Sequence, residues 1–170
     1  MNTKLERPYI YEKKVFKNLI INTRILEITY SENFNLIFYK TINISKGDNF
    51  EWIMRKMNLI IDAPFWVGDR EDWEKLIKNE SKIVKMNNEK IAYELVNIKY
   101  NNLIQVNNVE FLEKYLCISL DDEKILSIAY YSDSDYSWIL EEYNDKSFQE
   151  KMMVFCQGNQ LFAKNIPSKL

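Results

Sequence analysis

The first predicted elements lie in residues 15–44, where the chain is rich in Ile, Phe, Tyr and Thr. β-branched and aromatic residues favour strands, whereas Asn22 and Ser31, which interrupt the run, favour turns. We therefore predict a meander of three antiparallel strands, at 15–21, 24–30 and 35–44. The apolar side chains of the third strand fall mostly on one parity, which predicts a sheet with one buried and one wet face.

Two helices are predicted in the middle of the chain. Asp48 suits an N-cap, and the apolar residues behind it recur at helical spacing: Phe50, Ile53, Met54 and Met57. This spacing, together with the Asp48/Glu51 capping pattern, predicts a helix over 49–60. Asp69 opens the second helix, which has an acidic first turn. Its apolar face consists of Trp73, Leu76 and Ile77.

The second half of the chain predicts mainly strands. They cover 82–86, 89–98, 103–106, 117–120, 124–131 and 136–143, and the last two are predicted to form a hairpin. A short helix is predicted within 108–116. A second capping pattern, Ser147 with Glu150, predicts a final helix that runs through Phe155 and ends near Gly158.

The predicted fold class is α+β, in a single domain over residues 1–160. It comprises a mainly antiparallel sheet of six to eight strands with three or four short helices packed on it, followed by a loosely ordered tail over 161–170. The length of 170 residues and the 46% of apolar residues suit one core of this size. The N-terminus lacks the apolar run of a signal peptide, and no segment is apolar enough to span a membrane, so we expect a cytoplasmic protein.

The residue types exclude several common chemistries. Histidine is absent, which removes the most frequent general base and metal ligand. The three glycines, at 47, 68 and 158, are isolated, so no phosphate-binding glycine loop is present. Cys117 and Cys156 lie in apolar runs without the spacing of a metal site, and we predict that both are buried thiols. We expect no catalytic residue, no cofactor and no metal ion.

Charge is distributed unevenly along the chain. The net charge is −2, but residues 110–150 carry eleven carboxylates against three lysines. This acidic stretch would repel nucleic acid and attract a basic protein. Within it, residues 130–145 interleave aromatic rings with carboxylates and contain no Lys or Arg.

This stretch supplies the candidate site. Tyr and Trp dominate many binding interfaces, and surrounding carboxylates speed the encounter with a cationic partner. The predicted partner-binding residues are Asp133, Asp135, Tyr136, Trp138, Glu141, Glu142 and Asp145. Alternation separates Tyr136 and Trp138 from Glu141, and either face of the strand can be the exposed one. A sheet edge that is guarded by charge against aggregation explains the pattern equally well.

The function predicted from these features is that of an immunity protein. Such a protein would neutralise a basic bacterial toxin, for example a nuclease, by covering its active site with an acidic aromatic surface. One alternative is an enzyme that uses carboxylates and a divalent metal held by Asp133 and Asp135, although a solvated turn explains this pair better. The other is a small-molecule pocket behind Trp66, although a place at the edge of the core suits that ring better.

Overall fold

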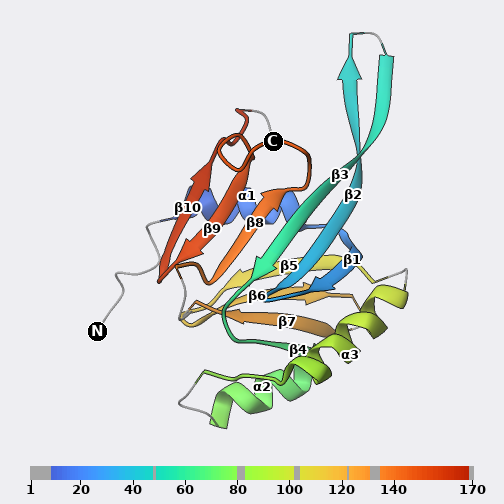
Figure 1. Cartoon of the computed structure of the whole chain (residues 1–170). Coiled ribbons are helices and arrows are strands. Elements are labelled where there is room, and N and C mark those ends of the chain that lie inside the picture. Colours follow the sequence, from blue (N-terminus) through green and yellow to red (C-terminus); the bar gives the residue numbers. More distant parts are fainter. Residues whose placement is uncertain are drawn as a thin grey trace.

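The fold is built from two antiparallel sheets and three helices. The computed structural model describes residues 9–47, 49–79, 83–101, 104–121, 123–130 and 135–168. In this part of the chain, strands β1-β2-β3-β8-β9-β10 form a six-stranded sheet, sheet A, and β4-β7-β6-β5 form a four-stranded sheet, sheet B (Figure 1). The α+β class is confirmed, but two sheets replace the single sheet that was predicted.

The bounds of the elements follow the chain. The helices are α1 (Ile10–Ile20), α2 (Arg70–Asn79) and α3 (Asn88–Tyr100). The strands of sheet A are β1 (Arg24–Tyr30), β2 (Phe34–Lys46), β3 (Asn49–Ile61), β8 (Trp138–Glu142), β9 (Met153–Gln157) and β10 (Gln160–Lys164). Those of sheet B are β4 (Phe65–Asp69), β5 (Val106–Phe111), β6 (Tyr115–Leu120) and β7 (Lys124–Ala129).

The hairpin of β2 and β3 is the longest feature of sheet A. The two strands pair over all thirteen residues, from Phe34 opposite Ile61 to Lys46 opposite Asn49. The predicted helix over 49–60 is therefore wrong, and its predicted cap, Asp48, lies outside the described residues. Met57, Leu59 and Ile61 alternate into the core, and the long pairing with β2 outweighs the helical spacing of the apolar residues before them.

Two segments predicted as strands are helices. In α1 the buried residues Val15, Phe16, Leu19 and Ile20 form one helical face. In α3 the buried residues are Ile91, Leu95 and Ile98, and the Asn87 side chain accepts a hydrogen bond from the Lys90 N–H at the N-cap. The predictions of strands at 15–21 and 89–98 are therefore wrong, because the apolar residues of these segments follow a helical period. The helix predicted to start after Asp69 is confirmed as α2.

The C-terminal third also differs from expectation. β7 and β8 belong to different sheets and form no hairpin with each other. Residues 108–116 contain β5 and the turn into β6 in place of a helix, and the predicted final helix is replaced by the β9–β10 hairpin. The predicted tail begins at 161, but residues 160–164 pair with β9, because Gly158 adopts a positive φ of 59° in the turn that returns the chain.

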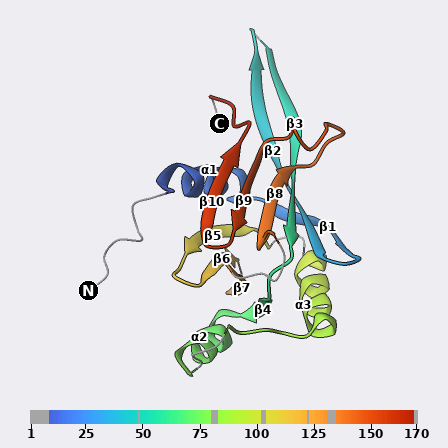
Figure 2. The same cartoon turned by 60° about the vertical axis from the view of Figure 1, so that its left-hand side comes forward.

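The core lies between the two sheets, and α1 closes one side of it. Phe16 of α1 meets Trp138 of sheet A edge-to-face at 5.0 Å and Phe111 of sheet B at 5.6 Å between ring centroids. α1 lies behind β8–β10 in the view of Figure 1, and α2 and α3 lie beside sheet B (Figure 2). In the parts of the chain that the structure describes, no helix has the length and apolar character needed to cross a membrane.

Candidate functional site

Trp138 lies in the core and not on a contact surface. Its side chain is 0% exposed and packs against Phe16 of α1. The pairing of β8 with β3 and β9 fixes this orientation, because Trp138 lies opposite Ile61 on one side and Cys156 on the other, and all three are buried. The prediction that Trp138 contacts a partner is therefore corrected. Trp138 positions β8 from inside the fold.

Glu141 is also withdrawn from solvent. Its carboxylate lies 3.1 Å from the Lys151 ammonium, and the two side chains are only 9% and 16% exposed. A nearly buried carboxylate of this kind needs its cation, since a lone charge would be strongly destabilising there. Glu141 therefore contributes a neutral ion pair to the surface of sheet A, and not the free negative charge that was expected.

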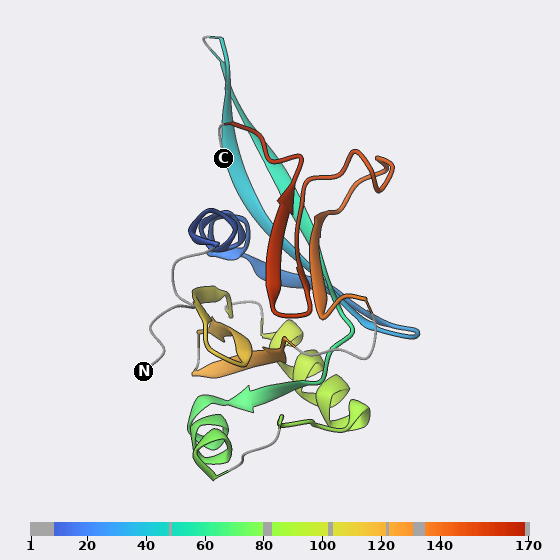
Figure 3. The ribbon, with the colours of Figure 1, turned by 90° about the vertical axis from the view of Figure 1, so that its left-hand side faces the viewer.

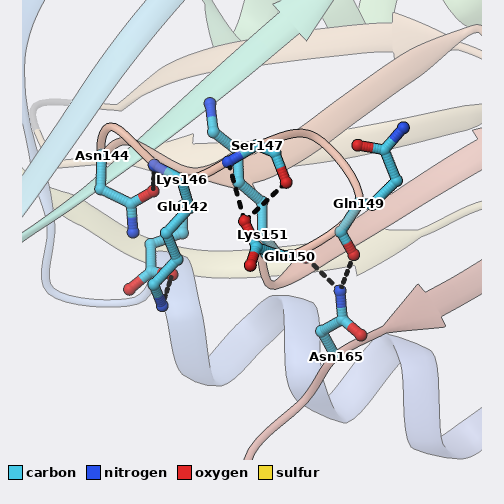
Figure 4. Close-up of polar contacts among 8 residues, drawn as sticks. All are labelled: Glu142, Asn144, Lys146, Ser147, Gln149, Glu150, Lys151 and Asn165. Atoms are coloured by element: carbon cyan, nitrogen blue, oxygen red, sulfur yellow. Dashed lines mark hydrogen bonds and ion pairs between the residues drawn. The ribbon is translucent and has the colours of Figure 1, made fainter.

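Other charged side chains in and next to the loop from β8 to β9 form ion pairs and hydrogen bonds with one another (Figure 4). Glu142 forms an ion pair with Lys146 at 3.1 Å, and Glu150 accepts hydrogen bonds from the hydroxyl and the N–H of Ser147. These bonds lower the pKa of Glu150. The predicted contact between Ser147 and Glu150 thus exists, but it closes a turn and caps no helix. The Asn165 amide, after β10, donates to the carbonyls of Gln149 and Lys151 and holds the loop in place.

The remaining predicted site residues lie at the two ends of β8. Asp135 and Asp145 are exposed, and Tyr136 is half-buried with its ring 5.5 Å from Phe155. Asp133 lies outside the described residues. The six described residues of the predicted site therefore do not form one acidic hairpin. Asp135, Tyr136 and Asp145 remain on the surface, whereas Trp138 and Glu141 are structural.

Sheet A has one face that points away from α1, which we call the outer face. A row of aromatic and aliphatic side chains lies on it. Register places Ile60, Ile139, Phe155 and Phe162 opposite one another on β3, β8, β9 and β10. Phe155 stacks on Phe162 at 5.1 Å, and Tyr136 packs edge-on against Phe155. We name Tyr136, Phe155 and Phe162 the aromatic row. Phe162 is 38% exposed.

No described helix covers this face. Figure 3 shows α1 and sheet B on the same side of β8–β10, with the other side open. Of the aromatic row, the sequence predicts Tyr136 as a site residue but not Phe155 and Phe162, because Phe155 is predicted in a final helix and Phe162 in the tail. The signal was nonetheless present, since Gly158-Asn159 between two apolar runs is typical of a two-residue hairpin turn.

The β2–β3 hairpin carries a second exposed apolar group. Beyond the body of the protein its two strands form an arm, which we define as residues 40–46 and 49–55 (Figures 1 and 2). On one face of β3, Phe50, Trp52 and Met54 are 73%, 68% and 53% exposed. Their cross-strand neighbours are small and polar: Ser45, Asn43 and Thr41. The stripe therefore has no apolar cover from its own hairpin.

Lys40 fixes the base of the arm to α1. Its ammonium donates hydrogen bonds to the carbonyls of Asn18 and Ile21 at 2.6 and 3.2 Å, at the C-terminal end of the helix. Burial, and secondarily the neighbouring Arg55, lowers the pKa of Lys40. A cation suits this position, because the last carbonyls of a helix carry partial negative charge.

The alternative sites receive less support from the geometry. Trp66 packs on Trp73 at 5.5 Å in the core, as favoured over a pocket role, and it lines neither of two surface cavities, of about 410 and 370 Å³. The larger cavity lies where the β1–β2 turn meets the β3–β4 connection and includes Asp62 and Lys85. Within the described ranges no three Cys, Asp or Glu side chains are grouped as metal ligands would be.

The two cysteines are buried, as predicted. Cys117 is 1% and Cys156 0% exposed, and neither forms a disulfide. Burial raises the pKa of both thiols, that of Cys156 to about 11. Both thiols therefore stay protonated and unreactive at neutral pH.

Comparison with known proteins assigns no relatives. No family model matches the sequence, and neither the curated proteins nor the solved structures searched gave a significant match.

Proposed function

We propose that this chain is a small inhibitor of the immunity-protein class, which binds a basic bacterial toxin, such as a nuclease, on the outer face of sheet A. The observation that carries the proposal is an aromatic row that no described helix covers, with an exposed carboxylate in the chain beyond each end of β8. Phe155 and Phe162 stack across β9 and β10, and Tyr136 packs on Phe155 from the segment before β8. Asp135 precedes β8 and Asp145 follows it.

The aromatic row suits the centre of an interface. Large rings with few rotatable bonds bury much area at a low cost in conformational entropy. Phe155 and Phe162 already stack on each other, so their side chains should lose little conformational entropy on binding. Fully buried interface centres are depleted of free charge, and the Glu141–Lys151 pair beside the row is internally neutralised.

The charge around the row favours a cationic partner. Residues 135–151 contain five carboxylates and two lysines, a net charge of −3, and the two lysines are those paired with Glu141 and Glu142. Exposed charge at the rim of an interface mainly accelerates association and rejects partners of like sign. Asp135 and Asp145 would act in this way. Blockage of the toxin's active site would be steric, with these carboxylates taking the positions of substrate phosphates.

A binding and inhibition experiment tests this function. The immobilised protein is exposed to extract of its source organism at low ionic strength, and a retained basic protein is produced in pure form and assayed for nuclease activity. The proposal expects that an equimolar amount of this chain abolishes that activity and that high salt releases the complex. A retained protein whose activity is unaffected by the chain would contradict the proposal.

Variants locate the surface. Phe162→Ala should weaken binding by about 1–2 kcal/mol, the usual loss at an interface anchor. The pair Asp135→Lys with Asp145→Lys should slow association about tenfold or more at low salt. Glu113→Lys, an exposed charge reversal in the β5–β6 turn of sheet B, is the matched control and should leave both quantities unchanged. Equal effects of all three variants would argue against an interface on the outer face.

A further inference from the structure

The arm has an open strand edge next to its exposed apolar stripe. β8 pairs with β3 only from Met57 onward, and one further bond joins the Tyr143 N–H to the Lys56 carbonyl at 3.1 Å. Over residues 49–55, no strand in the described part of the chain pairs with the edge of β3 that faces away from β2. An open edge of this length is a template for another strand.

Three large apolar side chains along this edge remain mostly exposed to solvent. Phe50, Trp52 and Met54 all exceed 50% exposure, and they point to one face of β3 at successive alternate positions. Soluble proteins rarely expose three large apolar residues side by side unless the patch meets a partner. The arm also extends beyond the sheet body, so a partner strand can approach without crossing the core (Figure 1).

The sequence of this edge is complementary to itself. If two copies of β3 pair antiparallel about a twofold axis at Trp52, each Phe50 lies opposite the partner's Met54 and the two Trp52 rings lie opposite each other. Asn49 then lies opposite the partner's Arg55, so no like charges meet across the pair. Aromatic–aromatic and aromatic–methionine contacts between strands are favourable, and both stripes join on one face.

The other edge of the arm does not offer this match. An equivalent antiparallel pairing of β2 over residues 40–46 would place Lys40 opposite the partner's Lys46. Directly opposed like charges destabilise a strand pair. Lys40 is also committed to the end of α1. Pairing therefore closes as a dimer and does not continue into a fibre.

We propose that two copies of this chain form a dimer in which the β3 edges of their arms pair antiparallel around Trp52, making one four-stranded intermolecular sheet. The dimer uses residues 49–55 and leaves the aromatic row free. The dimer proposal is therefore independent of the proposed inhibitor function, which needs only the outer face of sheet A.

Mass measurement tests the assembly. Analytical ultracentrifugation of the full chain from about 1 to 200 μM should show a concentration-dependent dimer, because a short edge interface gives micromolar affinity. Trp52→Glu should shift the chain to a monomer, with an unchanged circular dichroism spectrum, and weaken association at least tenfold. Phe162→Glu, a matched apolar-to-acid change on the aromatic row, should leave the dimer intact. A wild-type chain that stays monomeric throughout this range would overturn the proposal.

Directed disulfides test the register and keep Trp52 in place. Asn49→Cys and Arg55→Cys chains, mixed and mildly oxidised, should cross-link with each other, because register places these positions in direct opposition. Asn49→Cys alone should not cross-link, since its two copies would lie about 20 Å apart along the strands. The native cysteines do not interfere because both are buried. Cross-linking of Asn49→Cys alone as fast as in the mixture would refute the register.

Discussion

Strands β6 and β7 of sheet B and the arm of sheet A both contain large apolar residues, but in opposite environments. In β6 all six residues are buried, and in β7 the last five are, because sheet A and the helices pack against sheet B in a common core. In the arm, Phe50 and Trp52 lie mostly in water. The apolar type of a strand residue therefore does not by itself determine its burial. The presence of a covering layer determines it.

This contrast separates apolar residues that the fold needs from those that it leaves over. The core cluster already joins both sheets, α1 and α3 without any contribution from the stripe on the arm. Folding therefore gives no reason for a tryptophan at position 52, and it accounts for only part of the phenylalanine at position 162, which stacks on Phe155 but remains 38% exposed. The proposed dimer and inhibitor interfaces would give a reason for Trp52 and for the exposed part of Phe162, and the contrast can be tested with matched substitutions.

The largest difference is expected between two tryptophans. Trp138→Ala should lower the free energy of unfolding by about 3–5 kcal/mol, because a fully buried ring leaves a cavity. Trp52→Ala should change it by less than about 0.5 kcal/mol when measured at concentrations below those of the dimer. Urea unfolding followed by circular dichroism measures both.

Trp138→Phe refines this comparison. The indole N–H of Trp138 has no hydrogen-bond partner in the described structure, so the smaller ring should cost less than alanine does. If Trp52→Ala proved as destabilising as Trp138→Ala, the arm would belong to the folding unit and the contrast would fail.

Two ion pairs of equal length give the next largest difference. Glu141–Lys151 and Glu142–Lys146 both span 3.1 Å, but the first is nearly buried and the second is substantially exposed. Glu141→Gln should destabilise the protein by about 2–3 kcal/mol, because it leaves the Lys151 charge without a partner where water has little access. Glu142→Gln should cost less than about 1 kcal/mol.

Salt sharpens the result for these two variants. Raising the ionic strength should reduce the small effect of Glu142→Gln further and leave the effect of Glu141→Gln almost unchanged, because buried pairs are screened less. Thermal unfolding at low and high sodium chloride measures this. Equal costs for the two variants would indicate that Glu141 is more accessible than its 9% exposure implies.

The smallest effect concerns the buried thiols. In the native protein at pH 8 a thiol reagent should label neither Cys117 nor Cys156, whereas both should react in urea. Burial raises the pKa of Cys156 from 9.0 to about 11. The unfolded chain then releases its proton first, so the free energy of unfolding falls as pH rises from 9 to 11. Rapid labelling of the native state would show that β9 opens readily.

Part of the fold was predictable from sequence because its local pattern is unambiguous. β1, α2, β6 and β7 combine a clear period with a turn or cap at the expected place, and their predicted positions are close to those observed. Burial of both cysteines followed from their apolar surroundings. Of the candidate site, Asp135 and Asp145 are exposed and Tyr136 is half-buried.

The remaining predictions failed where a segment fits two periods. In β3 the residues Phe50, Ile53, Met54 and Met57 suit a helix, yet thirteen cross-strand pairs with β2 determine a strand. In α3 a run rich in Ile and Tyr suggests a strand, yet Ile91, Leu95 and Ile98 pack on one helical face. Local preferences of well under 1 kcal/mol per residue decide nothing against such contacts.

By itself, the sequence determined the mixture of helices and strands, the buried thiols and the acidic character of the second half, because these depend on residue type and nearest neighbours. Only the tertiary structure decided that β7 and β8 separate into two sheets, that Trp138 is in the core while Trp52 is in water, and that Glu141 is neutralised by Lys151. These outcomes depend on which strands pair and which faces are covered. Contacts between residues far apart in the chain determine both.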